Sequence, residues 1–382
     1  MKTSSPNRKG KIAIIADPLD NQRAGVHVFT RELINALIEL GVSDQLLLVR
    51  ERKDDDLPIE QLIVPNTRLP IGFASFRLFI LVPYLLRRRG VVAVFEPAHF
   101  GPFNLPRSIK RITMIHDLTP LLFPQYHRWH SQLLQRIFLK GILKRTDWVF
   151  TNSSNTAKDV AAYFPFASSK LSKLPLGIQS IFEPTHKKLN YSFLKSNKPY
   201  FIYVGTIEPR KNIDLLLEAF ETFCLSNNKQ VELVLAGQKG WKTEAFNQAL
   251  AAHPFKESIH LTGYVPLADL PTLYTRSLAL IYPSEYEGFG FPVVEAMACG
   301  TPVITAKNSS LQEVGEGHAL FFPTGDKGAL LARMQQVVRG DSLPSAKTLR
   351  DYAATFSWSA CGRTFWETCQ SIIRSDSQAP RK

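Results

Sequence analysis

Apolar runs of three to six residues alternate along this chain with longer segments in which apolar side chains return at helical spacing. Residues 11–16 read KIAIIA, the pattern of a buried strand, and residues 29–40 then place Phe29, Leu33 and Leu37 on one helical face. A strand followed by a helix is the unit that builds a parallel sheet covered by helices. Further strands are expected at residues 46–49, 91–95, 111–115, 148–151, 172–176, 200–204, 231–236, 259–262, 279–282, 302–305 and 320–322.

The alternation is interrupted between residues 177 and 197 by a polar stretch that contains proline. We place a domain boundary near Ser180 and expect an α/β protein with two Rossmann-like domains, residues 1–180 and 181–355. A chain of 382 residues is long enough to bury two cores. The last segment, residues 356–382, is expected to start a final helix that Ser357 caps.

The cysteines and the apolar segments both indicate a cytoplasmic protein. The four cysteines include no Cys-x-x-Cys pair, which argues against a zinc site or a disulfide framework and fits a reducing compartment. No uninterrupted apolar run reaches the length of about 18 residues that a spanning helix needs, and no secretory segment follows the polar N-terminus.

Positive charge is concentrated in the first half of the chain. Residues 1–180 hold 25 Lys and Arg against 14 Asp and Glu, a net of +11, whereas the remaining 21 and 19 give +2, for the total of +13. Such a surface suits nucleic acid, an anionic membrane or an anionic substrate, but no nucleic-acid motif is present and no nucleic-acid partner is expected. Residues 71–89 (IGFASFRLFILVPYLLRRR) leave two interpretations open: a segment that lies on an anionic membrane surface, or a core-facing helix with a solvated basic end.

The stretch from residue 279 to residue 302 carries the strongest chemical pattern. A short strand ends at Pro283, the loop around Gly288, Phe289 and Gly290 follows, and Pro292 suits the first turn of a helix. A helix that starts after a glycine loop presents free N–H groups and a positive dipole end, which favour an anion such as a diphosphate.

Two carboxylates frame this loop, Glu287 before it and Glu295 in the expected first turn of the helix. Carboxylates beside an anion site are suited to accept hydrogen bonds from hydroxyl groups, so the pattern indicates a ligand that combines phosphate and polyol. The alternative is an ordinary strand–loop–helix joint with solvated glutamates.

Two further strand ends carry candidate residues. Arg210 and Lys211 follow the strand at residues 200–204, where two cations would stabilise a diphosphate leaving group; the alternative is a pair of solvated basic side chains. His116 and Asp117 follow the strand at residues 111–115, at the edge where parallel sheets bind ligands, although a lone histidine is often structural.

The spacing Glu287-x7-Glu295 around Gly-Phe-Gly resembles the signature of retaining glycosyltransferases of the GT-B fold, family 4, and the resemblance spans most of the chain. It implies two Rossmann-like domains that face a central cleft, with the final helix crossing back to the first domain. It also implies transfer of a hexose from a nucleotide sugar with retained configuration. No metal or other cofactor is expected, and the Asp-x-Asp at residues 54–56 falls in a polar loop.

The resemblance also implies roles for residues. Lys211 and Arg210 would stabilise the departing diphosphate, Glu287 would hold the sugar hydroxyls, and His116 would contact the same sugar from the other domain. Thr206 departs from the family pattern, which often has arginine there, and Ala24-Gly25 replaces the paired glycines of many members. The implied donor-binding residues are Gly25, Asp117, Gly205, Thr206, Gly263, Tyr264, Val265, Gly288, Phe289, Gly290 and Glu295, of which Glu295 would bind the ribose.

The HDLTP and GTIEPRKN segments resemble bacterial mannosyltransferases of surface polysaccharide assembly such as that of lipopolysaccharide. GDP-mannose is therefore the first expected donor and a UDP-sugar the second, with a glycan or lipid-linked acceptor. The basic first half adds an anionic membrane surface as an expected partner, which would make the protein peripheral on the inner face of the plasma membrane. Two other functions stay open: a nucleotide-sugar epimerase or phosphorylase on the same fold, and a non-catalytic assembly protein on the membrane surface.

Overall fold

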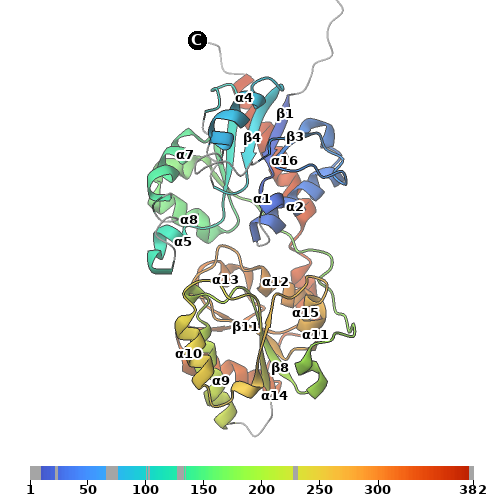
Figure 1. The fold of residues 1–382 in the computed structure, drawn as a ribbon, viewed down its shortest axis with the longest axis vertical. Helices are drawn as coiled ribbons and strands as arrows, with labels where there is room; N and C mark the ends of the chain where they lie inside the picture. Colours follow the sequence, from blue (N-terminus) through green and yellow to red (C-terminus); the bar gives the residue numbers. More distant parts are fainter. Residues whose placement is uncertain are drawn as a thin grey trace, which may run out of the picture. The chain divides into compact units, whose positions relative to one another are not determined.

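The computed structural model of the chain describes residues 10–21, 25–65, 76–99, 101, 104–126, 133, 135–226 and 231–377. The chain divides into two compact units, the first made of Met1–Gly177 with Ser357–Lys382 and the second of Ile178–Phe356. Each unit has a parallel sheet covered by helices on both faces, the Rossmann-like architecture that the sequence predicts (Figure 1).

The first unit contains a parallel sheet in the order β3-β2-β1-β4-β5-β6-β7. The order reverses at β1, so the carboxyl ends of β1 and β4 flank the switch point at which open α/β sheets bind ligands. The strands are β1 (Lys11–Ile15), β2 (Leu46–Arg50), β3 (Gln61–Ile63), β4 (Val91–Glu96), β5 (Lys110–Ile115), β6 (Trp148–Thr151) and β7 (Leu171–Lys173).

Helices α2 (Gly25–Glu39) and α16 (Trp358–Ser377) cover one face of this sheet. The ring of Phe365 on α16 lies 4.7 Å from that of Phe95 on β4, and Phe29 on α2 lies 6.4 Å from the same ring. The final helix therefore packs on the first unit, as the family resemblance implies. Ser357 Oγ accepts a hydrogen bond from Ala360 N at 3.2 Å, so the expected cap is confirmed.

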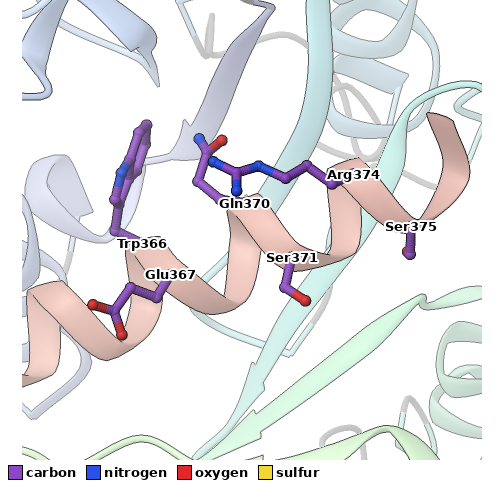
Figure 2. A pocket seen from close by; sticks show the side chains of 6 residues that line it. All are labelled: Trp366, Glu367, Gln370, Ser371, Arg374 and Ser375. Atoms are coloured by element: carbon purple, nitrogen blue, oxygen red, sulfur yellow. The ribbon is translucent and has the colours of Figure 1, made fainter. Parts of the chain in front are cut away.

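A hollow of about 500 Å³ lies along α16, and the sequence singled out none of the described residues that line it (Figure 2). It is lined by Trp366, Glu367, Gln370, Ser371, Arg374 and Ser375.

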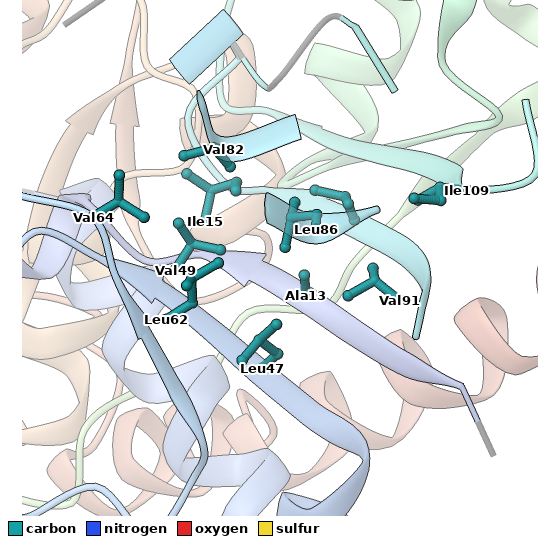
Figure 3. Packing of buried hydrophobic residues seen from close by; sticks show 11 residues of the cluster. Ala13, Ile15, Leu47, Val49, Leu62, Val64, Val82, Leu86, Val91 and Ile109 are labelled. Carbon is teal, nitrogen blue, oxygen red and sulfur yellow. The ribbon is translucent and has the colours of Figure 1, made fainter. Parts of the chain in front are cut away.

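The opposite face of the sheet is identified by the strand register. Ala13 pairs with Val94, and Val94 pairs with Arg111, so these side chains point to one face. Val82 and Leu86 pack on this face in a cluster of aliphatic side chains (Figure 3). The other helices that the structure describes in this unit are α1 (Pro18–Asn21), α4 (Val82–Leu86), α5 (Thr119–Leu122), α7 (Lys140–Arg145) and α8 (Ser154–Tyr163), with π-helical turns η2 (Arg77–Leu81) and η4 (Gln135–Leu139).

The second unit repeats the architecture with the strand order β10-β9-β8-β11-β12-β13. Its order reverses at β8, so the carboxyl ends of β8 and β11 flank the second switch point. The strands are β8 (Tyr200–Val204), β9 (Glu232–Ala236), β10 (Ile259–Gly263), β11 (Ala279–Tyr282), β12 (Val303–Ala306) and β13 (Leu320–Phe322). The helices are α9 (Ile213–Ser226), α10 (Glu244–Ala252), α11 (Leu270–Arg276), α12 (Phe291–Ala298), α13 (Ser309–Val314), α14 (Lys327–Arg339) and α15 (Ala346–Ala353).

Short 3₁₀ turns connect several of these elements in both units. They are η1 (Ser43–Gln45), η3 (Pro124–Tyr126), η5 (Pro165–Lys170), η6 (Ser192–Ser196), η7 (Pro209–Lys211) and η8 (Lys256–Ser258).

Every strand that the sequence predicts is present, with its ends displaced by three residues at most. Strand β3 was not predicted, because it has three residues of which only Leu62 is buried and so shows too little alternation. The position expected for Glu295 was wrong: α12 starts at Phe291, which puts Glu295 in its second turn.

The segment 71–89 was expected to be either a membrane-surface segment or a core-facing helix with a solvated basic end. Its residues 71–75 lie outside the described residues. From Arg77 onward the segment is helical, with Val82 and Leu86 buried and Arg87, Arg88 and Arg89 exposed. None of the helices in the described ranges is long and apolar enough to cross a membrane.

Candidate active site

Two cationic side chains of the second unit lie in the turn η7, after the loop that follows β8. Pro209 sets the helical φ at the start of the turn η7, and Asn212, in the left-handed conformation with φ 54°, ends it. Lys211 at the end of η7 is 8% exposed and Arg210 is half-buried. Glu285 N donates to the carbonyl of Arg210 at 3.0 Å, which ties this turn to the loop that follows β11.

The carboxylate of Glu287 lies between the two cations. Its oxygens are 2.5 Å from Lys211 Nζ and 3.0 Å from an Arg210 Nη atom, and Ser284 Oγ donates to it at 2.6 Å. Burial by itself would raise the pKa of Glu287, but the charges of Arg210 and Lys211 outweigh it and lower the pKa to about 2. Glu287 is therefore ionised throughout the neutral range and accepts hydrogen bonds without donating any.

A second carboxylate completes the charge balance, because Glu208 lies 2.7 Å from Arg210. Two cations and two carboxylates thus share one mostly buried site. Burial lowers the pKa of Lys211, whereas Glu287 raises it. A diphosphate that reaches these cations would gain attraction only by sharing them with carboxylates already present.

Two buried tyrosines support Lys211 and were not found by sequence reasoning. Tyr282 Oη accepts a hydrogen bond from Lys211 Nζ at 3.0 Å, and its ring stacks on that of Tyr203 at 6.0 Å. Burial raises the pKa of both phenols well above the usual value, so they remain neutral donors and acceptors. The signal that could have found them is their position near the carboxyl ends of the two strands that flank the switch point.

Ser310 binds two carbonyls of the glycine loop, whereas the amides of Phe289 and Gly290 remain available. Ser310 Oγ lies 2.8 Å from the carbonyl of Glu287 and 2.9 Å from that of Phe289. Gly290 precedes α12 with φ 102°, a conformation that side chains other than glycine rarely adopt. Within the described ranges, the amides of Phe289 and Gly290 donate to no protein acceptor. Two neighbouring amides without a protein acceptor are donors for an oxygen atom of a ligand.

Glu295 is held by the phenol of Tyr274 on α11, which donates to it at 3.0 Å. Burial raises the pKa of Glu295 to about 7, and the bond from Tyr274 opposes this rise only in part. Near neutral pH the carboxyl group can therefore either accept a hydrogen bond from a hydroxyl or donate one. Tyr274 was not predicted, because nothing in its local sequence distinguishes it from a core residue.

The other expected donor residues of this unit lie at neighbouring strand ends. Gly263 ends β10 and forms a bridge with Gly237, which follows β9. Tyr264 is 62% exposed, whereas Val265 is buried. Gly205 follows β8, and the exposed Thr206 uses its carbonyl to accept a hydrogen bond from Tyr203 at 3.0 Å.

In the first unit, His116 and Asp117 follow β5, as predicted. Asp117 Oδ1 accepts hydrogen bonds from the backbone N and the hydroxyl of Thr119, at 2.9 and 2.6 Å, so it shapes the turn into α5. His116 is half-buried, with Nε2 at 2.7 Å from the carbonyl of Pro97. Gly25 is the first residue of α2 and is exposed.

No group of three or more His, Cys, Asp or Glu side chains that could hold a metal ion occurs in the ranges that the structure describes. In the Asp-x-Asp stretch, Asp54 lies 3.0 Å from Arg50 and Asp55 lies 2.5 Å from Lys53.

Comparisons with known families match both units. The family model described as Glycosyltransferase Family 4 matches residues 23–180, and the one described as Glycosyl transferases group 1 matches residues 186–356.

Two curated relatives match almost their whole length. The chain is 29% identical over 375 residues to "O-antigen chain mannosyltransferase B" of Escherichia coli, covering 92% of this chain and 97% of the relative. It is 23% identical over 352 residues to "O-antigen chain mannosyltransferase RfbU" of Salmonella typhimurium, covering 89% and 94%.

Among solved structures, Anabaena Alr3699/HepE in complex with UDP-glucose superimposes with a TM-score of 0.72 at 17% identity, covering 95% of this chain and 100% of that one. At this level of identity the likeness concerns the fold.

Proposed function

We propose that this chain, which belongs to the group 1 and family 4 glycosyltransferases of the GT-B fold, transfers mannose from GDP-mannose with retained configuration. The acceptor is a glycan or lipid-linked oligosaccharide of surface polysaccharide assembly. The choice of mannose is supported by two relatives that match almost end to end and are named O-antigen mannosyltransferases. A UDP-sugar is the second candidate donor.

The observation that carries the proposal is the pairing of Glu287 with Lys211 and Arg210 beside the two available amides of the glycine loop. As the bond between sugar and diphosphate breaks, negative charge grows on the leaving phosphate, and two fixed cations stabilise it without any reorganisation. Glu287 and the amides of Phe289 and Gly290 hold the sugar hydroxyls. Glu295 binds the ribose.

Retention of configuration follows from attack on the same face that the leaving group departs from. The acceptor hydroxyl gives its proton to the departing phosphate as the new glycosidic bond forms, so no protein nucleophile is required. The two cations supply the charge stabilisation that a divalent ion supplies in metal-dependent transferases, and we therefore propose that the reaction needs no metal.

The donor is tested by thermal unfolding of the whole chain with GDP, UDP and ADP, each with and without EDTA. A nucleotide at a hundred times its dissociation constant adds about 2.7 kcal/mol to the stability of the folded state. We expect GDP to raise Tm and EDTA to leave that rise unchanged. A response to UDP alone would overturn the choice of donor, and loss of the response in EDTA would overturn metal independence.

The reaction is tested by product analysis with GDP-mannose and a lipid-linked acceptor. Transfer with an α-anomeric product from the α-anomeric donor supports a retaining transferase. An isomerised donor without transfer would favour the epimerase, and vesicle binding without nucleotide affinity would favour the non-catalytic assembly protein.

We further propose that the first unit docks on an anionic membrane from the cytoplasmic side. Phe76, Ile80 and Tyr84 follow one another at four-residue spacing and are 50%, 49% and 47% exposed, on the side of the helix that faces away from Val82 and Leu86. The Arg88 guanidinium lies 4.5 Å from the centre of the Tyr84 ring. Aromatic rings beside arginines suit the interface of an anionic bilayer.

A second helical segment extends this basic apolar surface on the same face of the sheet. Ile137 and Phe138 are 57% and 44% exposed, and Lys140 and Lys144 are exposed beside them. Its buried residue Leu143 packs with Val149, which pairs with Thr113 and so points to the same face as Val94. No Asp or Glu occurs at residues 61–95 or 118–146, so nothing on these stretches repels anionic lipid.

Sedimentation with vesicles tests the docking. Wild type is expected to bind vesicles that contain phosphatidylglycerol, less at high salt, and to bind less to purely zwitterionic vesicles. The triple change Phe76→Ser, Ile80→Ser, Tyr84→Ser should abolish binding, whereas Leu225→Ser, at an equally apolar exposed site in the second unit, should not. Equal binding by both variants, or concentration-dependent dimers in place of vesicle binding, would overturn the proposal.

A further inference from the structure

The turn that follows β4 contacts His116 at two atoms. The backbone N–H of His116 donates to Nε2 of His99 at 2.8 Å, and Nε2 of His116 lies 2.7 Å from the carbonyl oxygen of Pro97. Strands β4 and β5 are neighbours, with Glu96 paired to Thr113, so the end of one strand reaches the residue that follows the other. Both the main chain and the ring of His116 are thereby fixed by one short segment.

The contact with Pro97 determines which ring nitrogen of His116 carries the proton. A carbonyl oxygen can only accept, so Nε2 must carry hydrogen, and in the neutral ring Nδ1 then bears a lone pair. Burial lowers the pKa of His116, although the bond to Pro97 opposes this, so the ring is neutral at pH 7. Within the described part of the chain, Nδ1 has no hydrogen-bond partner, and the side chain is only half-buried.

His99 must itself be neutral to play its part, because Nε2 accepts a hydrogen bond. Burial lowers its pKa to about 4, and repulsion from the protonated form of His116 adds to this effect. Its backbone has φ 74°, an unusual conformation for a residue with a side chain, which persists only where the surroundings impose it. Glu96 holds the turn, accepting from Ala98 N at 2.7 Å and from Thr113 Oγ1 at 3.0 Å.

We propose that His99 is a positioning residue which, with the carbonyl of Pro97, presents His116 as the neutral tautomer protonated at Nε2, so that Nδ1 accepts a hydrogen bond from a sugar hydroxyl. The inference rests on the proposed function together with the family resemblance, which implies that His116 contacts the donor sugar. It also restricts the ligand: a lone pair attracts a hydroxyl hydrogen and repels a phosphate oxygen. His116 therefore binds the sugar and not the diphosphate.

The tautomer is measured directly by long-range ¹H–¹⁵N correlation spectra of protein labelled with ¹⁵N-histidine. The His116 signals are assigned by their absence in His116→Gln. At pH 7 we expect a protonated, pyrrole-type Nε2 and an unprotonated, pyridine-type Nδ1. The opposite tautomer, or a doubly protonated ring, would overturn the inference whatever the activity of the enzyme.

Two substitutions of His116 distinguish which ring nitrogen binds the sugar hydroxyl. An asparagine places its amide near the position of Nδ1, and a glutamine places it near that of Nε2. We expect His116→Asn to retain several-fold more kcat than His116→Gln, and the reverse order would contradict the role of Nδ1. If both variants retain full transfer while the spectra show the expected tautomer, the catalytic role of His116 fails and the assignment of the tautomer stands.

Substitutions of His99 test the positioning. Loss of one hydrogen bond corresponds to a factor of about 2 to 10, so His99→Ala should lower kcat by that factor with little change in the affinity for GDP. His99→Gln keeps an acceptor and should recover most of the loss. His253→Gln is the matched control, since that buried histidine holds a carbonyl in the second unit. Wild-type kcat and unchanged His116 signals in His99→Ala would refute the positioning role.

Discussion

Removing the charge of Glu287 while keeping its shape, with Glu287→Gln, separates the roles of this carboxylate in folding and in catalysis. In the folded chain Glu287 balances Lys211 and Arg210 in a site where it is 7% exposed and Lys211 is 8% exposed. A glutamine still accepts from Ser284 but leaves one positive charge uncompensated. The expected result is a less stable protein whose nucleotide site has become more attractive to anions.

The magnitude follows from the pKa. A fall from 4.5 to about 2 corresponds to about 3 kcal/mol of interaction between the ionised carboxylate and its surroundings. Removing one partner of a buried ion pair lowers the free energy of unfolding by a similar amount, about 3–5 kcal/mol. For a unit the size of Ile178–Phe356 this lowers Tm by about 6–12 °C.

The pH dependence has a definite sign. Because the folded-state pKa of Glu287 is depressed, its contribution to stability is complete above pH 4.5 and is lost as the pH falls from there towards 2. The difference in Tm between wild type and Glu287→Gln should therefore have its maximum value at pH 7 and should decrease below pH 4.5.

The assay combines thermal unfolding, calorimetric titration with GDP and mannose transfer on the same preparation. Glu287→Gln should lose transfer while binding GDP at least as tightly as wild type, because the diphosphate replaces the missing negative charge. Glu232→Gln is the matched control: its carboxylate is also buried and accepts a hydrogen bond from Ser196 Oγ at 3.2 Å, but it lies at the amino end of β9 and contacts no lysine or arginine within the described ranges. A change in Tm below about 1 °C, or GDP affinity that falls in step with transfer, would refute the charge-compensation argument.

Three further predictions use the same site. Because burial raises the pKa of Glu295 to about 7, ionisation of Glu295 destabilises the folded state as the pH rises from 4.5 through 7. In urea unfolding, Glu295→Gln should therefore be more stable than wild type at pH 8 but not at pH 4. Identical unfolding curves for the two proteins at both pH values would contradict this. Lys211→Met should lower kcat by about 10²–10³, the usual cost of removing one group that stabilises developing charge, in a single-turnover transfer assay, and a loss under tenfold would exclude Lys211 from that role. Ser310→Ala leaves the carbonyls of Glu287 and Phe289 without their hydrogen-bond donor, so it should lower the free energy of unfolding in urea by about 1–3 kcal/mol. It should also raise the KM for the nucleotide sugar. An unchanged KM would mean that the order of the loop does not affect binding of the nucleotide sugar.

The amino-acid pattern alone determined the two Rossmann-like units, most strand positions and the capping of α16. These features are encoded locally, because short apolar runs such as residues 11–16, bounded by turn residues, favour buried strands, and Ser357 acts on an amide three residues away. The approximate location of the candidate site was also determined by sequence, because ligands bind where parallel strands end and those ends can be counted along the chain.

Only the tertiary structure determined which of these residues act on one another. Glu287 and Lys211 are 76 positions apart and meet because β8 and β11 are neighbours in the sheet, although the six strands of this unit could have been arranged in other orders. The phenols of Tyr282 and Tyr274 are likewise part of the site because tertiary packing places them beside Lys211 and Glu295. His99 is held against His116 across the pair β4 and β5 in a backbone conformation that no local pattern predicts. Pairing across a sheet depends on the packing of the whole chain, and the charge balance, pKa values and tautomers of the site depend on that pairing.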